Sequence, residues 1–268
     1  MSAERLSLRG SEGTVSVAVW KPTRAERVVV IAHGYGEHIG RYEHVAADLA
    51  ARGAVVYGPD HLGHGESDGE RVLIADLEHV VDDLDRVIGS AQDAHPGLPT
   101  VLVGHSLGGL IATRYVQRPG RRPLAGLALS GPAVGLGPAV EQMRASPEIA
   151  EAPIDVSVLS RDSAVGEAYA ADPLVWHGAW KPATLESLAR ATAEVDAGPV
   201  FDLPVFWVHG TDDQLVPLEL ARPAVQRLAG ADLEEHVRQG ARHEVLNEVD
   251  KDEVLAALGA FVERVSSP

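Results

Sequence analysis

The segment at 104–108, Gly-His-Ser-Leu-Gly, places a serine between two glycines in a Gly-x-Ser-x-Gly pattern. An apolar run precedes it and a helix-like stretch follows, so Ser106 is expected on a tight turn from a strand into a helix. Such a turn admits only small neighbours, and it presents the hydroxyl beside the free N–H groups of a helix N-terminus. The alternative is a chance Gly-Ser turn, but the strand before it, the helix after it and the additional Gly109 favour a nucleophile.

A serine hydroxyl is a weak nucleophile unless a base takes its proton, and the chain offers twelve histidines. On a fold of this kind the base follows both the nucleophile and the acid in the sequence. Only His236 and His243 lie beyond the strand expected at 205–208. His236 falls inside a further expected strand, where most histidines are ordinary sheet residues. His243 lies in a loop before the last expected helix, at the same sheet edge as Ser106, and is the predicted base.

The acid should follow the strand expected at 205–208, and two adjacent carboxylates, Asp212 and Asp213, are present there. An Asp-rich turn at the end of a strand is common without any catalytic role. The order serine, aspartate, histidine nevertheless matches a triad in which the acid orients the imidazole and stabilises its charged form. Neighbouring side chains in such a turn point in different directions, so only one of the two can meet His243. The other is expected to accept backbone N–H groups of its own loop.

The negative charge that develops on a substrate carbonyl oxygen needs hydrogen-bond donors. One donor is the backbone N–H of Leu107, at the start of the expected helix. The second should come from the loop after the strand at 28–32, which reads His-Gly-Tyr-Gly at 33–36. Because glycine-rich backbone can turn its N–H groups toward the nucleophile, we predict the backbone N–H of Tyr35 as the second donor and its ring as pocket wall.

The histidines His33, His61 and His64 invite a metal-site interpretation. The chain contains His-x-x-His at 61–64, but it has no H-E-x-x-H and no carboxylate–histidine pattern with typical zinc spacing. We therefore expect neither a metal nor a cofactor. We expect a polar, glycine-rich loop that holds backbone together.

Short β-rich runs alternate with helix-like stretches, a pattern typical of βαβ units and of a mostly parallel sheet. Val15–Trp20 alternates as an antiparallel edge strand should, whereas Val28–Ala32 is a continuous β-branched run, as expected of a strand covered on both faces. Further strands are predicted at 54–57, 100–103, 124–129, 205–208 and 233–238, and helices at 42–52, 76–94, 107–117, 218–229 and 250–265.

The alternation stops between 132 and 202, where seven prolines separate short helical pieces and no strand of the earlier type occurs. An inserted segment of this length is more often a functional lid than a plain connection. We predict an α/β core formed by 1–131 and 203–268, with a cap at 132–202. Some apolar residues of the cap are expected to line an acyl tunnel or to face the lipid phase; the alternative is that they pack the cap onto the core. They include Ile149, Ile154, Val156, Val158 and Leu159.

The composition limits the classes of function. The 268 residues are 45% hydrophobic, enough for a sizeable core. With 39 acidic against 23 basic residues, the net charge of −16 argues against nucleic-acid binding and against adhesion to anionic lipid. The absence of cysteine excludes disulfides, thiol nucleophiles and iron–sulfur clusters. No signal peptide and no membrane span is visible, so we expect a cytoplasmic protein whose transient contact with a lipid surface uses apolar cap residues.

Five segments together resemble the α/β-hydrolase superfamily and, within it, the monoacylglycerol lipase branch with its related lysophospholipases. They read HGYGEH at 33–38, DHLGHGES at 60–67, GHSLGG at 104–109, GTDDQLVP at 210–217 and HEVLNE at 243–248. The segment DPLVWHG at 172–178 is similar to the DPL…HG segment of the cap in that branch. The resemblance spans nearly the whole chain.

The resemblance implies roles for the residues at the expected catalytic edge. The family pattern Gly-x-x-Asp counts to Asp213, so Ser106, Asp213 and His243 would form the triad. The backbone N–H groups of Tyr35 and Leu107 would bind the oxyanion.

Two further positions match that branch at the polar, glycerol end of the pocket. They are Glu37 and Arg41. The mammalian members carry a second histidine shortly after the triad histidine, where this chain has Leu246, so its recognition of glycerol is expected to differ. Those members also have cysteines near the site, which this chain lacks.

The sequence therefore predicts a serine ester hydrolase with an α/β-hydrolase fold that acts on a small lipid ester, a monoacylglycerol, through an acyl-enzyme. A short-chain carboxylesterase and a lysophospholipase are the alternatives among such enzymes. A non-catalytic ligand receptor on the same fold often lacks a triad residue, whereas all three candidates are present here. A cofactor-free haloperoxidase or an epoxide hydrolase is a further alternative, although an epoxide hydrolase typically has aspartate in place of Ser106.

Overall fold

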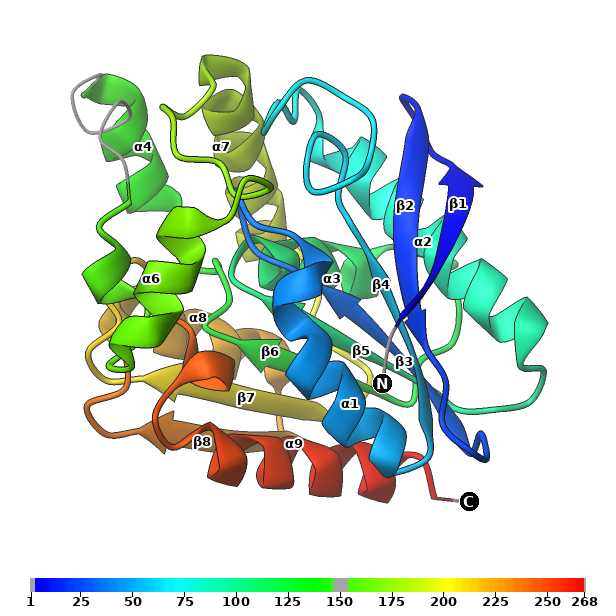
Figure 1. Ribbon diagram of the computed structural model, residues 1–268. Helices are drawn as coiled ribbons and strands as arrows, with labels where there is room; N and C mark the ends of the chain where they lie inside the picture. Colours follow the sequence, from blue (N-terminus) through cyan, green and yellow to red (C-terminus); the bar gives the residue numbers. More distant parts are fainter. Residues whose placement is uncertain (1–2, 147–153, 268) are drawn as a thin grey trace.

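The computed structural model describes residues 3–146 and 154–267. An eight-stranded sheet runs through the middle of the molecule in the order β1-β2-β4-β3-β5-β6-β7-β8 (Figure 1). β2 pairs antiparallel with β1 and β4, and all other neighbours pair parallel, which confirms the predicted mostly parallel α/β fold. The strands are β1 Glu4–Arg9, β2 Thr14–Trp20, β3 Arg27–Ala32, β4 Ala54–Pro59, β5 Thr100–His105, β6 Gly126–Ser130, β7 Val205–Gly210 and β8 Leu233–Arg238.

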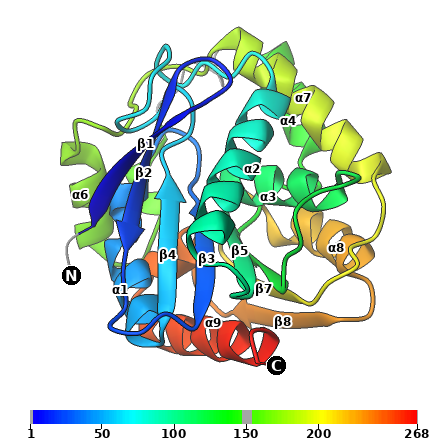
Figure 2. The same cartoon turned by 90° about the vertical axis from the view of Figure 1, so that its right-hand side faces the viewer.

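Five helices cover the two faces of this sheet (Figure 2). They are α1 Glu43–Ala51 and α9 Lys251–Val265 on one face, and α2 Leu77–Ala94, α3 Leu107–Gln117 and α8 Leu218–Ala229 on the other. In α2 the apolar residues recur at spacings of three and four and are buried, while Asp76 caps the first turn by accepting the N–H of Glu78 at 3.0 Å. No helix in the described parts of the chain is long and apolar enough to cross a bilayer.

The N-terminal side of the sheet differs from the prediction. The sequence predicts an edge strand at Val15–Trp20, but β1 pairs along the outer side of β2, so β2 is an inner strand and six of its seven residues are buried. The edge is β1, which the sequence analysis missed. Five of its six residues are exposed, because β1 is held mainly by backbone pairing rather than by burial of an apolar face.

The segment 132–202, here called the insert, leaves the sheet after β6 and returns at β7, beside the carboxyl edge of the parallel strands (Figure 1). Its described residues contain no strand, as predicted. Leu188, Ala191 and Val195 join the hydrophobic cluster that also holds α2 and α3, so part of the insert shares the main core. Ile149 lies outside the described residues. The helices in the described part of the insert are α4 Gly137–Ala145, the 3₁₀ helix η2 Val156–Val158, α6 Ser163–Ala171 and α7 Pro182–Ala197.

Candidate active site

Ser106 lies at the sharp turn between β5 and α3. Its backbone has φ 51° and ψ −117°, in a region that residues other than glycine rarely adopt. The flanking glycines permit the turn, because a Cβ on Gly104 would lie 2.5 Å from the carbonyl oxygen of Gly108, and one on Gly108 would lie 2.1 Å from that of Ala32. The turn places Ser106 at a cavity of about 470 Å³, which is where the Gly-x-Ser-x-Gly pattern predicts it.

Asp213 and His243 meet at the same edge of the sheet, the first after β7 and the second after β8. Nδ1 of His243 lies 2.8 Å from Oδ2 of Asp213, both side chains are buried, and His243 borders the cavity with Ser106. Burial opposes a charge on the imidazole, but the Asp213 carboxylate outweighs it and raises the pKa of His243 above its ordinary value. Against the opposing effect of burial, the same ion pair lowers the pKa of Asp213.

The hydrogen bonds of the adjacent Asp212 and Asp213 differ from those predicted. Oδ1 of Asp213 accepts the N–H groups of Leu215 at 3.0 Å and Val216 at 2.8 Å, while its Oδ2 meets the imidazole. Asp212 is exposed, and its carboxylate accepts the hydroxyl of Thr211 at 2.9 Å. The prediction that Asp212 accepts backbone N–H groups of this loop is wrong, because the two oxygens of Asp213 serve both purposes.

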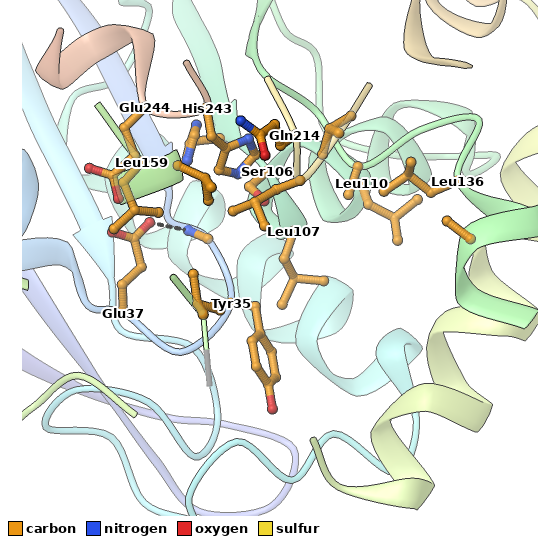
Figure 3. A pocket seen from close by; sticks show the side chains of 18 of the residues that line it. Tyr35, Glu37, Ser106, Leu107, Leu110, Leu136, Leu159, Gln214, His243 and Glu244 are labelled. Atoms are coloured by element: carbon orange, nitrogen blue, oxygen red, sulfur yellow. Dashed lines mark hydrogen bonds between the residues drawn. The ribbon is translucent and has the colours of Figure 1, made fainter. Parts of the chain in front are cut away.

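The predicted oxyanion donors, Tyr35 and Leu107, border the cavity beside Ser106 (Figure 3). Leu107 is the first residue of α3, where backbone N–H groups have no partner within the helix. Tyr35 follows Gly34, whose N–H donates to Oε1 of Glu37 at 2.6 Å. The Glu37 carboxylate therefore fixes the backbone of the loop that contains Tyr35.

The histidines His33, His61 and His64 hold backbone together, as predicted. Nε2 of His33 accepts the N–H of His61 at 3.0 Å, and Nε2 of His61 lies 3.0 Å from the carbonyl oxygen of His33. Nδ1 of His64 lies 2.9 Å from the carbonyl oxygen of Leu62. Burial lowers the pKa of His33, brings that of His61 to about 3 and brings that of His64 to about 4. These rings are therefore neutral near pH 7.

Glu37 and Arg41 lie at one end of the cavity, together with a residue that the sequence analysis missed. Arg41 forms an ion pair with Glu37 and donates through its two terminal nitrogens to both oxygens of Glu244, at 2.8 and 2.7 Å. Glu244 directly follows His243 and is buried; an acid next to the predicted base is its only signal in the sequence. Leu246, where the resemblance implies a histidine in mammalian members, packs into the core.

The cavity continues on the other side of Ser106 with an apolar lining (Figure 3). This apolar arm is formed by the core and the insert together, with Leu110, Leu136, Val140, Met143 and Leu188.

Three of the insert residues singled out from the sequence also line the cavity, namely Ile154, Val158 and Leu159. Val156 packs in a small cluster with Leu159 and is not part of the lining.

The insert contacts the loop that contains the predicted oxyanion donor. The N–H of Trp176 donates to the carbonyl oxygen of Gly36 at 2.7 Å. The ring of Trp180 stacks on Tyr35, with ring centroids 3.6 Å apart. The Tyr35 ring is thus part of the cavity wall, as predicted, and the insert covers it.

The insert also contacts the loop that contains His243. The N–H of Glu244 donates to the carbonyl oxygen of Leu159 at 2.8 Å. Nε of Arg161 lies 2.8 Å from Oε2 of Glu248, whose side chain is fully buried and whose Oε1 accepts the N–H of Arg242 at 2.9 Å. One buried carboxylate therefore joins the insert to the residue that precedes His243.

The fold and the site define a class of protein: an α/β-hydrolase with serine, histidine and aspartate gathered at the carboxyl edge of a parallel sheet. The family model Hydrolase_4, described as "Serine aminopeptidase, S33", matches residues 23–250. The chain belongs to this family of serine hydrolases.

Relatives place the chain more narrowly. It is 39% identical to "Monoacylglycerol lipase" of Mycolicibacterium smegmatis, over 91% of either chain. It is 34% identical to "Monoglyceride lipase" of Homo sapiens, over 84% of this chain and 78% of the relative. The crystal structure of Paleococcus ferrophilus monoacylglycerol lipase matches with a TM-score of 0.75 at 27% identity, over 99% of this chain and 100% of the other. The chain thus lies in the monoacylglycerol lipase-like branch, which confirms the resemblance.

Proposed function

We propose that this protein is a monoacylglycerol lipase in which Ser106, His243 and Asp213 form the catalytic triad. Oγ of Ser106 attacks the ester carbonyl carbon while Nε2 of His243 takes the hydroxyl proton, and Asp213 stabilises the imidazolium. The imidazolium then gives this proton to the glycerol oxygen as the carbon–oxygen bond to glycerol breaks. Water attacks the acyl-enzyme with His243 as base, which releases the fatty acid and restores Ser106.

The backbone N–H groups of Tyr35 and Leu107 bind the substrate oxygen in both tetrahedral intermediates in this proposal. Donors contribute most to rate when they are in place before charge develops. The hydrogen bond from Gly34 to Glu37 supports this role, because it orders the loop that contains Tyr35.

The single observation that carries the proposal is the two-sided cavity around Ser106. Glu37 and Glu244 lie on one side of the serine, and Leu110 and Leu136 lie on the other (Figure 3). A monoacylglycerol has the same division, with a polar glycerol and an apolar chain on either side of the ester bond.

The insert at 132–202 acts as a cap in this proposal, over a core of 1–131 and 203–268. Its residues Ile154 and Val158 line the cavity, which supports a role in admitting the acyl chain from a lipid surface. Because the net charge is −16, we expect this contact to rest on apolar burial and to resist added salt. A cytoplasmic location stays a prediction.

Hydrolysis rates on matched esters test the function. We expect kcat/KM to be highest on monoacylglycerols, to vary along a chain-length series, and to fall on diacylglycerols and triacylglycerols with the same acyl chain. Faster turnover of triacylglycerols, or turnover confined to short simple esters, would contradict the proposal. Faster turnover of lysophospholipids than of monoacylglycerols would identify a lysophospholipase instead.

A further inference from the structure

The polar end of the cavity is built around a cation, Arg41, that is already paired with two carboxylates. The side chain of Arg41 is 10% exposed. It pairs with Glu37 and forms a two-pronged contact with Glu244. A free guanidinium at this place would favour an anionic head group. Here two carboxylates share one guanidinium, so the formal charge of the three side chains is −1.

The carboxylate of Glu37 is held in its charged form. Its Oε1 accepts the N–H of Gly34 and the hydroxyl of Tyr42, each at 2.6 Å, and its Oε2 meets Arg41. Although burial opposes ionisation, Arg41 and these hydrogen bonds lower the pKa of Glu37. The carboxylate of Glu244 accepts the side-chain amide of Asn247 at 2.8 Å besides Arg41.

The neighbouring imidazole of His105 adds no compensating positive charge near pH 7. Burial and the neighbouring His243 lower the pKa of His105 to about 4, so its ring is neutral. The ring of Tyr169 lies 4.9 Å from the guanidinium carbon of Arg41 and covers this cation from one side.

We infer that Glu244 makes the alcohol end of the pocket select uncharged leaving groups and exclude anionic ones. This inference rests on the proposed function, because it assigns the polar end to the alcohol part of the ester. An anion brought there would lose water and meet a net negative charge, both of which cost free energy. A neutral glycerol loses little, since its hydroxyls can donate to carboxylate oxygens. The apolar arm accepts the same acyl chain in either case, so discrimination falls on the alcohol.

A matched pair of esters tests this inference. The two substrates are 1-octanoylglycerol and the octanoyl ester of glycerate at its primary hydroxyl, used below their aggregation concentrations. They share a three-carbon alcohol and differ in one terminal group, CH₂OH against carboxylate. We expect the parent protein to prefer the neutral ester by at least 100-fold in kcat/KM, and Glu244→Gln to narrow this ratio by at least tenfold, because one negative charge is removed.

Two further variants isolate the cause. Glu244→Asp keeps the charge and should keep most of the discrimination. Glu263→Gln removes one carboxylate from α9, on the outer face of the molecule, and should leave the ratio at the parent value. A ratio in Glu244→Gln equal to that of the parent would overturn the inference and leave the lipase proposal standing.

The parent protein alone provides a second measurement, which does not depend on the folding of any variant. If it hydrolyses both esters with similar kcat/KM, the inference is wrong while the ester hydrolase remains. If it hydrolyses neither ester, the proposed function fails, and the inference fails with it. Labelling of Ser106 by a small neutral serine-directed probe confirms that each variant is folded before the ratios are compared.

Discussion

The catalytic edge of the core and the insert are positioned by different kinds of contact. In the core, Ser106 directly follows β5, and Asp213 and His243 lie in the loops after β7 and β8, so the hydrogen-bonded sheet sets where these loops begin. The described part of the insert has no strand. It reaches the same loops through isolated backbone and side-chain hydrogen bonds, a ring stack and ion pairs such as that of Arg161 with the buried Glu248. The difference suggests that the core supplies the chemistry and that the insert adjusts alignment and selectivity.

The largest effect should come from the core, at the nucleophile. We expect Ser106→Ala to fold normally and to lose at least about 10⁴-fold in turnover, because no covalent intermediate can form. Turnover of 1-octanoylglycerol and labelling by a serine-directed probe measure this loss. A variant that keeps substantial turnover would show that Ser106 is not the nucleophile.

The next largest loss of turnover is expected on substitution of the proposed acid, Asp213. Asp213→Asn should lower kcat by roughly 10⁴-fold, since an amide cannot stabilise the imidazolium or hold the required tautomer. Asp212→Asn is the matched control: its side chain is exposed and contacts only the hydroxyl of Thr211 in the described hydrogen bonds, so kcat should change by less than about threefold. Loss of turnover in Asp212→Asn instead would reverse the assignment.

The pH dependence of kcat/KM also tests the pairing of Asp213 with His243. In the proposed mechanism the neutral imidazole of His243 is the base, so kcat/KM should fall as the pH drops through its pKa. Asp213 raises this pKa above the ordinary value of 6.5, and the acid limb of the parent should therefore lie above pH 6.5. In Asp213→Asn the limb should move to lower pH. A limb that stays in place would exclude His243 as the titrating group.

A smaller effect is expected where the insert holds the histidine loop. Arg161→Gln removes the charged partner of the buried Glu248 and should lower kcat by roughly tenfold while KM changes little, because the loop before His243 loses alignment. Arg144→Gln is the control, since it removes an insert arginine that pairs with the exposed Glu141 and Glu186. Equal kcat in the two variants would show that the insert does not align the loop.

The smallest effect should appear in chain-length preference. Val158→Ser places a hydroxyl in the cavity wall and should lower kcat/KM on long-chain relative to short-chain monoacylglycerols by a few fold. Val156→Ser changes a neighbouring residue that packs outside the lining and should leave this ratio at the parent value. Equal losses on long and short chains in Val158→Ser would contradict a tunnel role for the insert.

Sequence analysis predicted features that depend on local chain geometry. The turn at Ser106 follows from its flanking glycines, and the parallel strands follow from β-branched runs such as Val28–Ala32. It missed features that depend on distant partners. Arg41 and Glu244 are 203 residues apart, and neither residue type nor spacing predicts their contact. The same holds for β1, whose place in the sheet depends mainly on pairing with β2.

The ion pairs at the polar end link recognition of the head group to the positions of the loops that contain Tyr35 and His243. Glu37 bonds to the loop of Tyr35, and through Arg41 it reaches Glu244, the neighbour of His243. We therefore expect a mutation that adapts this end to a new head group also to displace backbone next to the proposed oxyanion donor or the proposed base. Among the described residues, the side chains of the apolar arm (Leu110, Leu136, Val140, Met143 and Leu188) take part in no such chain of hydrogen bonds and ion pairs. We expect acyl-length preference to drift among homologues through single substitutions, whereas head-group preference should change more slowly, because a substitution at this end also disturbs the two loops.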